Sequence, residues 1–225
     1  MSTPSRASHA GDVQGPAQRP ELLLACGLMA FAGILLSLML MGVAAVLVRH
    51  DFIADTISDL ARGPMKWIMD LGFYLNAGAL LALAIGTAHF HLGRVAWSLG
   101  LFCLAFAALV VVLLGLWDEF HTAAGPDQDM TVHTKLTFAL GPLYLAGPLL
   151  MASGASSMGR RYGYMFCAAA ALWLVLATGF KLVPTAYDGI LEKAAMTATL
   201  LWTLSLAWIL TTRGYHRLKD RAVAG

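Results

Sequence analysis

Residues 22–48 read LLLACGLMAFAGILLSLMLMGVAAVLV and contain no Asp, Glu, Lys or Arg. An α-helix needs about 20 apolar residues to cross the hydrocarbon core of a bilayer. Lipid offers no partners to backbone N–H and C=O groups, so a segment of this kind crosses as a helix. The stretch is also too long for the apolar core of a signal peptide, which has about 7–15 residues. It therefore predicts a retained transmembrane helix.

Further charge-free runs follow at residues 71–88, 97–117, 136–159, 162–180 and 194–212. The chain is 59% hydrophobic and only 12% charged, whereas soluble domains are about 25% charged. The sequence therefore predicts an all-α polytopic membrane protein, a bundle of six transmembrane helices within residues 21–212. The expected spans are about 22–48, 68–88, 97–117, 136–156, 162–181 and 191–211. A disordered tail is expected at 1–20 and a basic tail at 213–225.

The distribution of Lys and Arg predicts the orientation of the chain, because cytoplasmic loops carry an excess of these residues. With the N-terminus inside, nine of them face the cytoplasm: Arg6, Arg19, Arg94, Arg160, Arg161, Arg213, Arg217, Lys219 and Arg221. Six face the other side: Arg49, Arg62, Lys66, Lys135, Lys181 and Lys193. We therefore expect a protein of the cell (inner) membrane with both termini cytoplasmic.

The first outward loop reads HDFIADTISDLARGPMKW, residues 50–67. Asp51, Asp55 and Asp59 are spaced by four, which would place them on one side of a helix. Thr56 and Asp59 have the spacing of a capping box at a helix N-terminus. Ser58 and Asp59 are candidate catalytic residues if this helix faces a cavity between the spans. The alternative is an interfacial helix whose acidic side chains face water.

A second group of polar residues brackets the loop between the third and fourth spans. Asp118 and His121 follow the third span, and His133 precedes the fourth. Two histidines and a carboxylate suffice for an open Zn²⁺ site, where a bound water would attack an ester or amide. No compact motif such as HExxH accompanies them, and interfacial histidines also cap helices or contact lipid headgroups. Zinc is a candidate cofactor, whereas haem is not expected because no His lies inside a span.

Ionisable and amide side chains also occur within or beside the spans, where charge is costly unless it is paired or faces water. These residues are Asp70, Asn76, Lys181, Asp188, Glu192 and Lys193. They predict either a polar path through the bundle or ion pairs between helices, Lys181 with Glu192 being one such pair. The fourth span contains GPLYLAGP at residues 141–148. Each Pro bends its helix, which suits a cavity but is also found in packed bundles.

Three short motifs together resemble a known family. They are ISDL at 57–60, GLWDEF at 115–120 and DGILEK at 188–193. The pattern is similar to the domain-of-unknown-function family numbered 998, which implies six spans and carries no established activity. The chain departs from the family pattern at Ala61 in place of Gly, at WDEF in place of a Phe–Pro pair, and at Lys193 in place of Arg.

Two classes of function remain open on these residues. The first is a non-enzymatic transport, lipid-binding or accessory role with a polar site at the outer face. The second is a metal-dependent membrane hydrolase acting on a lipid or lipid-linked substrate, with Asp118, His121 and His133 as ligands. Membrane hydrolases related to alkaline ceramidase offer a chemical analogy, although no His lies between His133 and His216 here. The expected partners are the bilayer and a lipid or small-molecule ligand, without nucleic acid.

Overall fold

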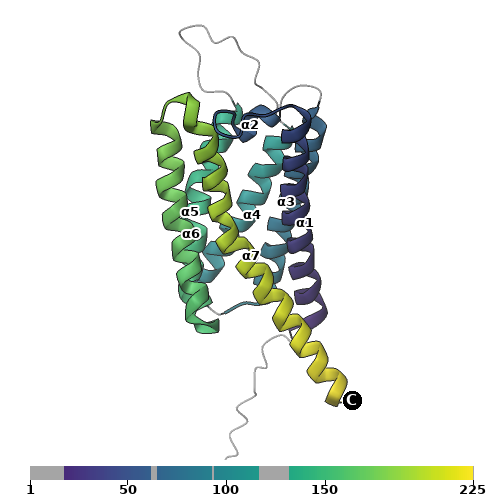
Figure 1. Ribbon diagram of the computed structural model, residues 1–225. Helices are drawn as coiled ribbons and strands as arrows, with labels where there is room; N and C mark the ends of the chain where they lie inside the picture. The colour runs from purple at the N-terminus through teal and green to yellow at the C-terminus, as the bar shows by residue number, and fades with distance from the viewer. Residues whose placement is uncertain (1–17, 62–64, 93, 117–131, 225) are drawn as a thin grey trace, which may run out of the picture.

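A computed structural model describes residues 18–61, 65–92, 94–116 and 132–224 (Figure 1). In this part of the chain, six helices are long and apolar enough to cross a membrane, which confirms the predicted architecture. They are α1 (Pro20–Leu47), α3 (Lys66–His89), α4 (Val95–Leu116), α5 (Val132–Met158), α6 (Arg160–Leu182) and α7 (Thr185–Ala224). A short helix, α2 (Ile57–Leu60), lies in the connection between α1 and α3.

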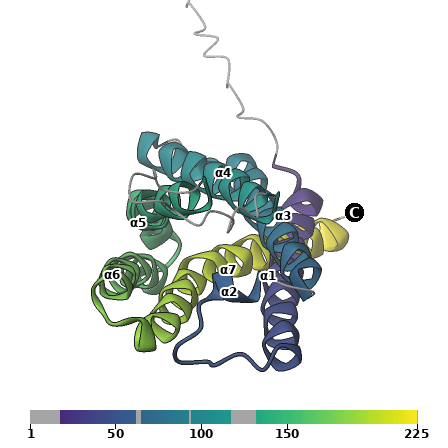
Figure 2. The same ribbon diagram turned by 90° about the horizontal axis from the view of Figure 1, so that it is seen from above.

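The six long helices form a closed ring when the bundle is viewed along its axis (Figure 2). Each packs against its neighbours in the order α1, α3, α4, α5, α6, α7 and back to α1. Helices α3 and α7 also touch across the ring, and α2 contacts α1 and α7 at one end. Trp97, Trp202 and Leu206 are fully buried between the helices, whereas Val46 and Val175 on the outside are mostly exposed. Apolar side chains therefore face both the core and the lipid.

Helix α7 contains 40 residues and is about 60 Å long at 1.5 Å per residue. It extends beyond the rest of the bundle at the end where α1 begins (Figure 1). There it crosses α1 closely, because a Cβ placed on Gly27 or on Gly214 would overlap the other helix. Small residues allow such close approach between membrane helices. Arg221 and Glu21 form an ion pair of 3.2 Å across the crossing.

The spacing of Asp51, Asp55 and Asp59 predicted one helix in the connection between α1 and α3, and this prediction is wrong for Asp51 and Asp55. Helix begins only at Ile57, and Asp51 instead caps a turn, its Oδ1 accepting the N–H groups of Ile53 at 2.9 Å and Ala54 at 3.2 Å. A short Asp side chain competes with helix formation through such local bonds. The predicted capping box is confirmed, because the Thr56 side chain accepts from the Asp59 N–H and the Asp59 side chain accepts from the Thr56 N–H.

Candidate functional site

A cavity of about 530 Å³ lies within the helix ring, at the end that carries α2. Its walls come from α2, α3, α4, α5, α6 and α7. The volume falls in the range of about 300–1,000 Å³ that is typical of small-molecule sites. Along α5 the lining runs from His133 to Leu145, a depth of about 18 Å at the helical rise. The cavity therefore extends from one end of the bundle into its apolar part.

The polarity of the lining changes along the cavity. Most deeper residues are apolar or aromatic, such as Val111, Leu140 and Trp173, and Asn76 on α3 is a polar exception. The Trp173 indole N–H donates to the Gly141 carbonyl at 3.1 Å, which ties α6 to the first Gly–Pro pair of α5. Polar lining residues come mostly from the helix ends beside α2; they are Ser58, Asn76, His133, Thr137, Thr178, Lys181 and Glu192. An amphipathic arrangement results, polar at one end and apolar beyond it.

Ser58 and His133, two residues singled out in the sequence for different roles, meet in this lining. The Ser58 Oγ lies 3.1 Å from the His133 Nε2, although the residues are 75 positions apart. His133 is only 8% exposed. A Ser hydroxyl within hydrogen-bonding distance of an imidazole is the arrangement that activates a serine nucleophile. The same bond also joins α2 to the first turn of α5.

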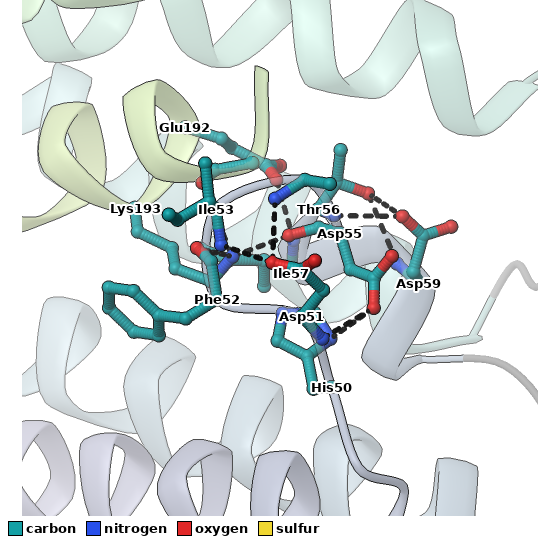
Figure 3. Close-up of polar contacts among 12 residues, drawn as sticks. His50, Asp51, Phe52, Ile53, Asp55, Thr56, Ile57, Asp59, Glu192 and Lys193 are labelled. Atoms are coloured by element: carbon teal, nitrogen blue, oxygen red, sulfur yellow. Dashed lines mark hydrogen bonds and ion pairs between the residues drawn. The ribbon is translucent and has the colours of Figure 1, made fainter. Parts of the chain in front are cut away.

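Residues 50–60, here named the cap segment, are held to the start of α7 by Lys193 (Figure 3). The Lys193 ammonium donates to the carbonyls of Phe52 at 3.2 Å, Asp55 at 2.5 Å and Gly189 at 3.3 Å. It also lies 5.0 Å from the centre of the Phe52 ring. Lys193 is only 7% exposed, so these carbonyls replace the water that would otherwise solvate its charge.

Glu192 and Gly189 complete the attachment of the cap segment. The Glu192 Oε2 accepts the backbone N–H of Ile57 at 2.6 Å, at the first turn of α2. The backbone N–H of Ile190 donates to the Ile53 carbonyl at 2.9 Å. A Cβ on Gly189 would overlap the Asp55 carbonyl, so the close approach requires glycine. The ISDL and DGILEK motifs are therefore in direct contact in the folded chain.

The electrostatics of the cap segment concern His50 and Asp51, which lie outside the spans. The His50 side chain is 2% exposed, with its Nδ1 3.6 Å from an Asp55 oxygen. Burial lowers the pKa of His50, and the nearby Lys193 charge lowers it further against the opposing effect of the aspartates. The backbone N–H groups of Ile53 and Ala54 lower the pKa of Asp51. The fold therefore favours neutral His50 and ionised Asp51.

The other polar residues predicted from the sequence, Asp70, Asn76 and Asp188, do not form a cluster with one another. Asp70 pairs with Lys66 at 2.6 Å along α3 and does not line the cavity. Asn76 lines the cavity and is a hydrogen-bond partner of the Tyr144 side chain. Asp188 lies in the first turn of α7, where negative charge is favoured by the helix dipole.

Lys181 and Glu192 both line the cavity, but no ion pair joins them in the described part of the chain. The Lys181 ammonium lies instead over the rings of Phe138 and Phe180, at 5.0 and 4.3 Å from their centres.

Two polar wall residues were not identified from the sequence. Thr137 lies one turn after His133 on α5, and Thr178 lies almost one turn before Lys181 on α6. Residues three or four apart share a helix face. The spacing of Thr137 from His133 and of Thr178 from Lys181 could therefore have identified both threonines as wall residues.

The predicted zinc ligands Asp118 and His121 lie outside the described residues. Among the residues that the structure describes, no group of three or more His, Cys, Asp or Glu is arranged to hold a metal ion. The zinc site stays a prediction of the sequence, with His133 placed beside Ser58.

Residues 31–209 match the family described as "Protein of unknown function (DUF998)". The match covers most of the chain and confirms the resemblance seen in its short motifs. No curated protein and no solved structure matches the chain.

Proposed function

The chain belongs to the family of proteins of unknown function named DUF998, and since that membership assigns no activity, we propose from the site that it binds an amphipathic lipid. The lipid headgroup would occupy the polar end of the cavity beside α2. Its hydrocarbon would lie against the deeper apolar wall. With both termini in the cytoplasm, as the Lys and Arg distribution predicts, the headgroup end faces the outer leaflet.

The observation that carries this proposal is the change from polar to apolar lining within one cavity. Phe138 and Leu174 line it and keep 50% and 51% of their surface uncovered by protein. Apolar surface of this kind is available to a hydrocarbon chain, which would contact it through van der Waals packing, the interaction that drives association within a bilayer. A soluble polar solute would leave this surface unused, so the lining favours a ligand with an apolar tail.

A cavity-filling variant tests the proposal. Ala177 lines the cavity on α6, and Ala171 on the same helix does not. We expect Ala177→Phe to weaken binding of a fluorescent phospholipid by about tenfold, a loss of about 1.4 kcal/mol. Ala171→Phe, the matched control, is expected to bind like the unaltered protein. Equal binding by both variants, with both folded by thermal unfolding, would show that the lipid does not occupy this cavity.

The Ser58–His133 hydrogen bond favours a second candidate function, hydrolysis of a lipid ester. Ser58 would attack the ester carbonyl while His133 takes its proton; the ester C–O bond would break, and the lipid alcohol would leave with that proton. Water, deprotonated by His133, would then attack the acyl-serine and release a carboxylic acid and free Ser58. Labelling with a fluorophosphonate probe tests this role. Labelling that is lost in Ser58→Ala and retained in Ser157→Ala is the expected result for a nucleophile. An unlabelled, folded protein would leave the 3.1 Å contact as a tie between helices.

A further inference from the structure

The cavity wall carries two opposite charges that are not paired with each other. Lys181 is in the last turn of α6 and Glu192 is near the start of α7. The Lys181 charge acts on the Glu192 carboxylate, but no ion pair within 4 Å joins the two in the described residues. Each is held by other contacts, so a positive and a negative group face the same polar end of the cavity.

The Lys181 ammonium has aromatic neighbours and no carboxylate partner among the residues that the structure describes. The faces of the Phe138 and Phe180 rings attract the ammonium through cation–π interactions. These contacts leave the N–H donors of the ammonium, three in number, able to bind an anion. Phosphate oxygens are the acceptors that such a point charge binds in many sites.

Glu192 also keeps a carboxylate oxygen available to accept hydrogen bonds from a ligand. Its Oε2 accepts from the Ile57 N–H, and the described residues provide no hydrogen bond to its Oε1. A carboxylate has about four lone-pair sites. Glu192 is therefore able to accept from a ligand ammonium without releasing the cap segment.

Other nearby charges already have partners in the cap segment. Lys193 is bound to three backbone carbonyls. Asp55 accepts the Asp51 N–H at 2.7 Å and lies beside His50, while Asp59 closes the capping box. The charges presented by the wall itself are thus Lys181 and Glu192.

We propose that the ligand is a zwitterionic phospholipid, with its phosphate at Lys181 and its ammonium at Glu192. This inference rests on the proposed lipid-binding function and specifies the headgroup. An anionic headgroup without an ammonium would face the Glu192 charge uncompensated, and a headgroup without phosphate would leave Lys181 unused. Repulsion by the Glu192 carboxylate disfavours the first alternative, and the absence of an acceptor for the Lys181 ammonium disfavours the second.

The test compares three lipids with identical acyl chains, phosphatidylethanolamine, phosphatidylglycerol and diacylglycerol, by native mass spectrometry of the detergent-solubilised full chain. We expect phosphatidylethanolamine to bind about tenfold more tightly than either of the others, as one charged hydrogen bond is worth about 1.5 kcal/mol or more. Glu192→Gln keeps an acceptor for the Ile57 N–H, and it should abolish the preference over phosphatidylglycerol. Lys181→Gln should reduce the preference over diacylglycerol to what the contact of the ammonium with Glu192 provides, while Lys135→Gln, off the cavity wall, should change neither preference.

The outcomes separate the two proposals. Equal binding of the three lipids, or tighter binding of phosphatidylglycerol, would overturn the headgroup assignment and leave lipid binding intact. Binding of none of them would overturn both. Competition by soluble glycerophosphoethanolamine as strong as by the intact lipid would also overturn the assignment to a lipid, because the free headgroup would then be sufficient.

Discussion

Replacing Gly189 by Ala tests whether the cap segment depends on close contact with α7. Gly189 is helical, so Ala alone would stabilise the helix by about 0.8–1 kcal/mol. The added Cβ overlaps the Asp55 carbonyl, which is backbone and cannot move without displacing the cap segment. We therefore expect the opposite sign, a net loss of stability.

The magnitude follows from the bonds that the displacement breaks. The Ile190–Ile53 backbone bond is worth about 0.5–1.5 kcal/mol, and the charged Lys193–Asp55 bond about 1.5–3 kcal/mol. After subtraction of the helix gain, the net loss is about 1–3.7 kcal/mol. At about 2–4 °C per kcal/mol for a chain of this size, the unfolding temperature should fall by about 2–15 °C.

The assay is thermal unfolding of the purified protein in one detergent, with Gly78→Ala as the matched control. Gly78 lies within α3, and a Cβ there meets nothing within 4 Å. That variant should melt at the same temperature as the unaltered protein or slightly above it. If Gly189→Ala melts with the control, the contact between the cap segment and α7 contributes nothing, and the reasoning fails.

Three other predictions concern the same region. Lys193→Met should lower the free energy of unfolding by about 2–4 kcal/mol, because it leaves buried carbonyls without a donor. Limited proteolysis should cut the cap segment faster in this variant than in Lys193→Arg, and equal rates of cleavage would contradict the prediction. Thr56→Ala should lower the free energy of unfolding by about 1 kcal/mol, because it removes the side chain that caps α2. The variant should unfold at a lower temperature than the unaltered protein, and an unchanged unfolding temperature would contradict the prediction. Because the folded pKa of His50 is lowered, the unfolded chain binds the proton first as pH falls through about 6.5. Stability should therefore decline from pH 7 towards the lower folded pKa, and His50→Gln should flatten the decline in melting curves between pH 7.5 and 5.

The number of spans was predictable from the sequence because it depends on length and composition alone. A run such as 22–48 has no stable conformation in lipid other than a helix. The capping box was predictable for a related reason, since Thr56 and Asp59 interact within one turn. The extent of α7 was not, because Arg213 and Lys219 mark where a membrane span ends rather than where a helix ends. Charged residues continue a helix readily in water.

The cavity and the attachment of the cap segment could not be derived from the pattern of residues. In a soluble bundle the apolar face of a helix identifies the core, but here residues facing lipid and residues facing the core are both apolar. Val175 and Trp173 lie two positions apart on α6, and Val175 is mostly exposed whereas Trp173 is buried. The contacts of Lys193 with Phe52 and Asp55 span 141 and 138 positions. The sequence around Lys193 contains no pattern that indicates contact partners so far away in the chain.

Glu192 and Lys193 are adjacent charged residues at the start of α7, and helix geometry gives them different contacts. Successive residues in a helix are rotated by about 100°, so Glu192 and Lys193 point in different directions. Lys193 is directed at the cap segment and satisfied there, whereas Glu192 lines the cavity and also accepts the Ile57 N–H. A ligand that contacts Glu192 therefore contacts a group that positions α2. Binding of the proposed ligand to Glu192 would therefore couple occupancy of the cavity to the position of α2, in addition to the contacts of Lys193 and Ile190 that also hold the cap segment.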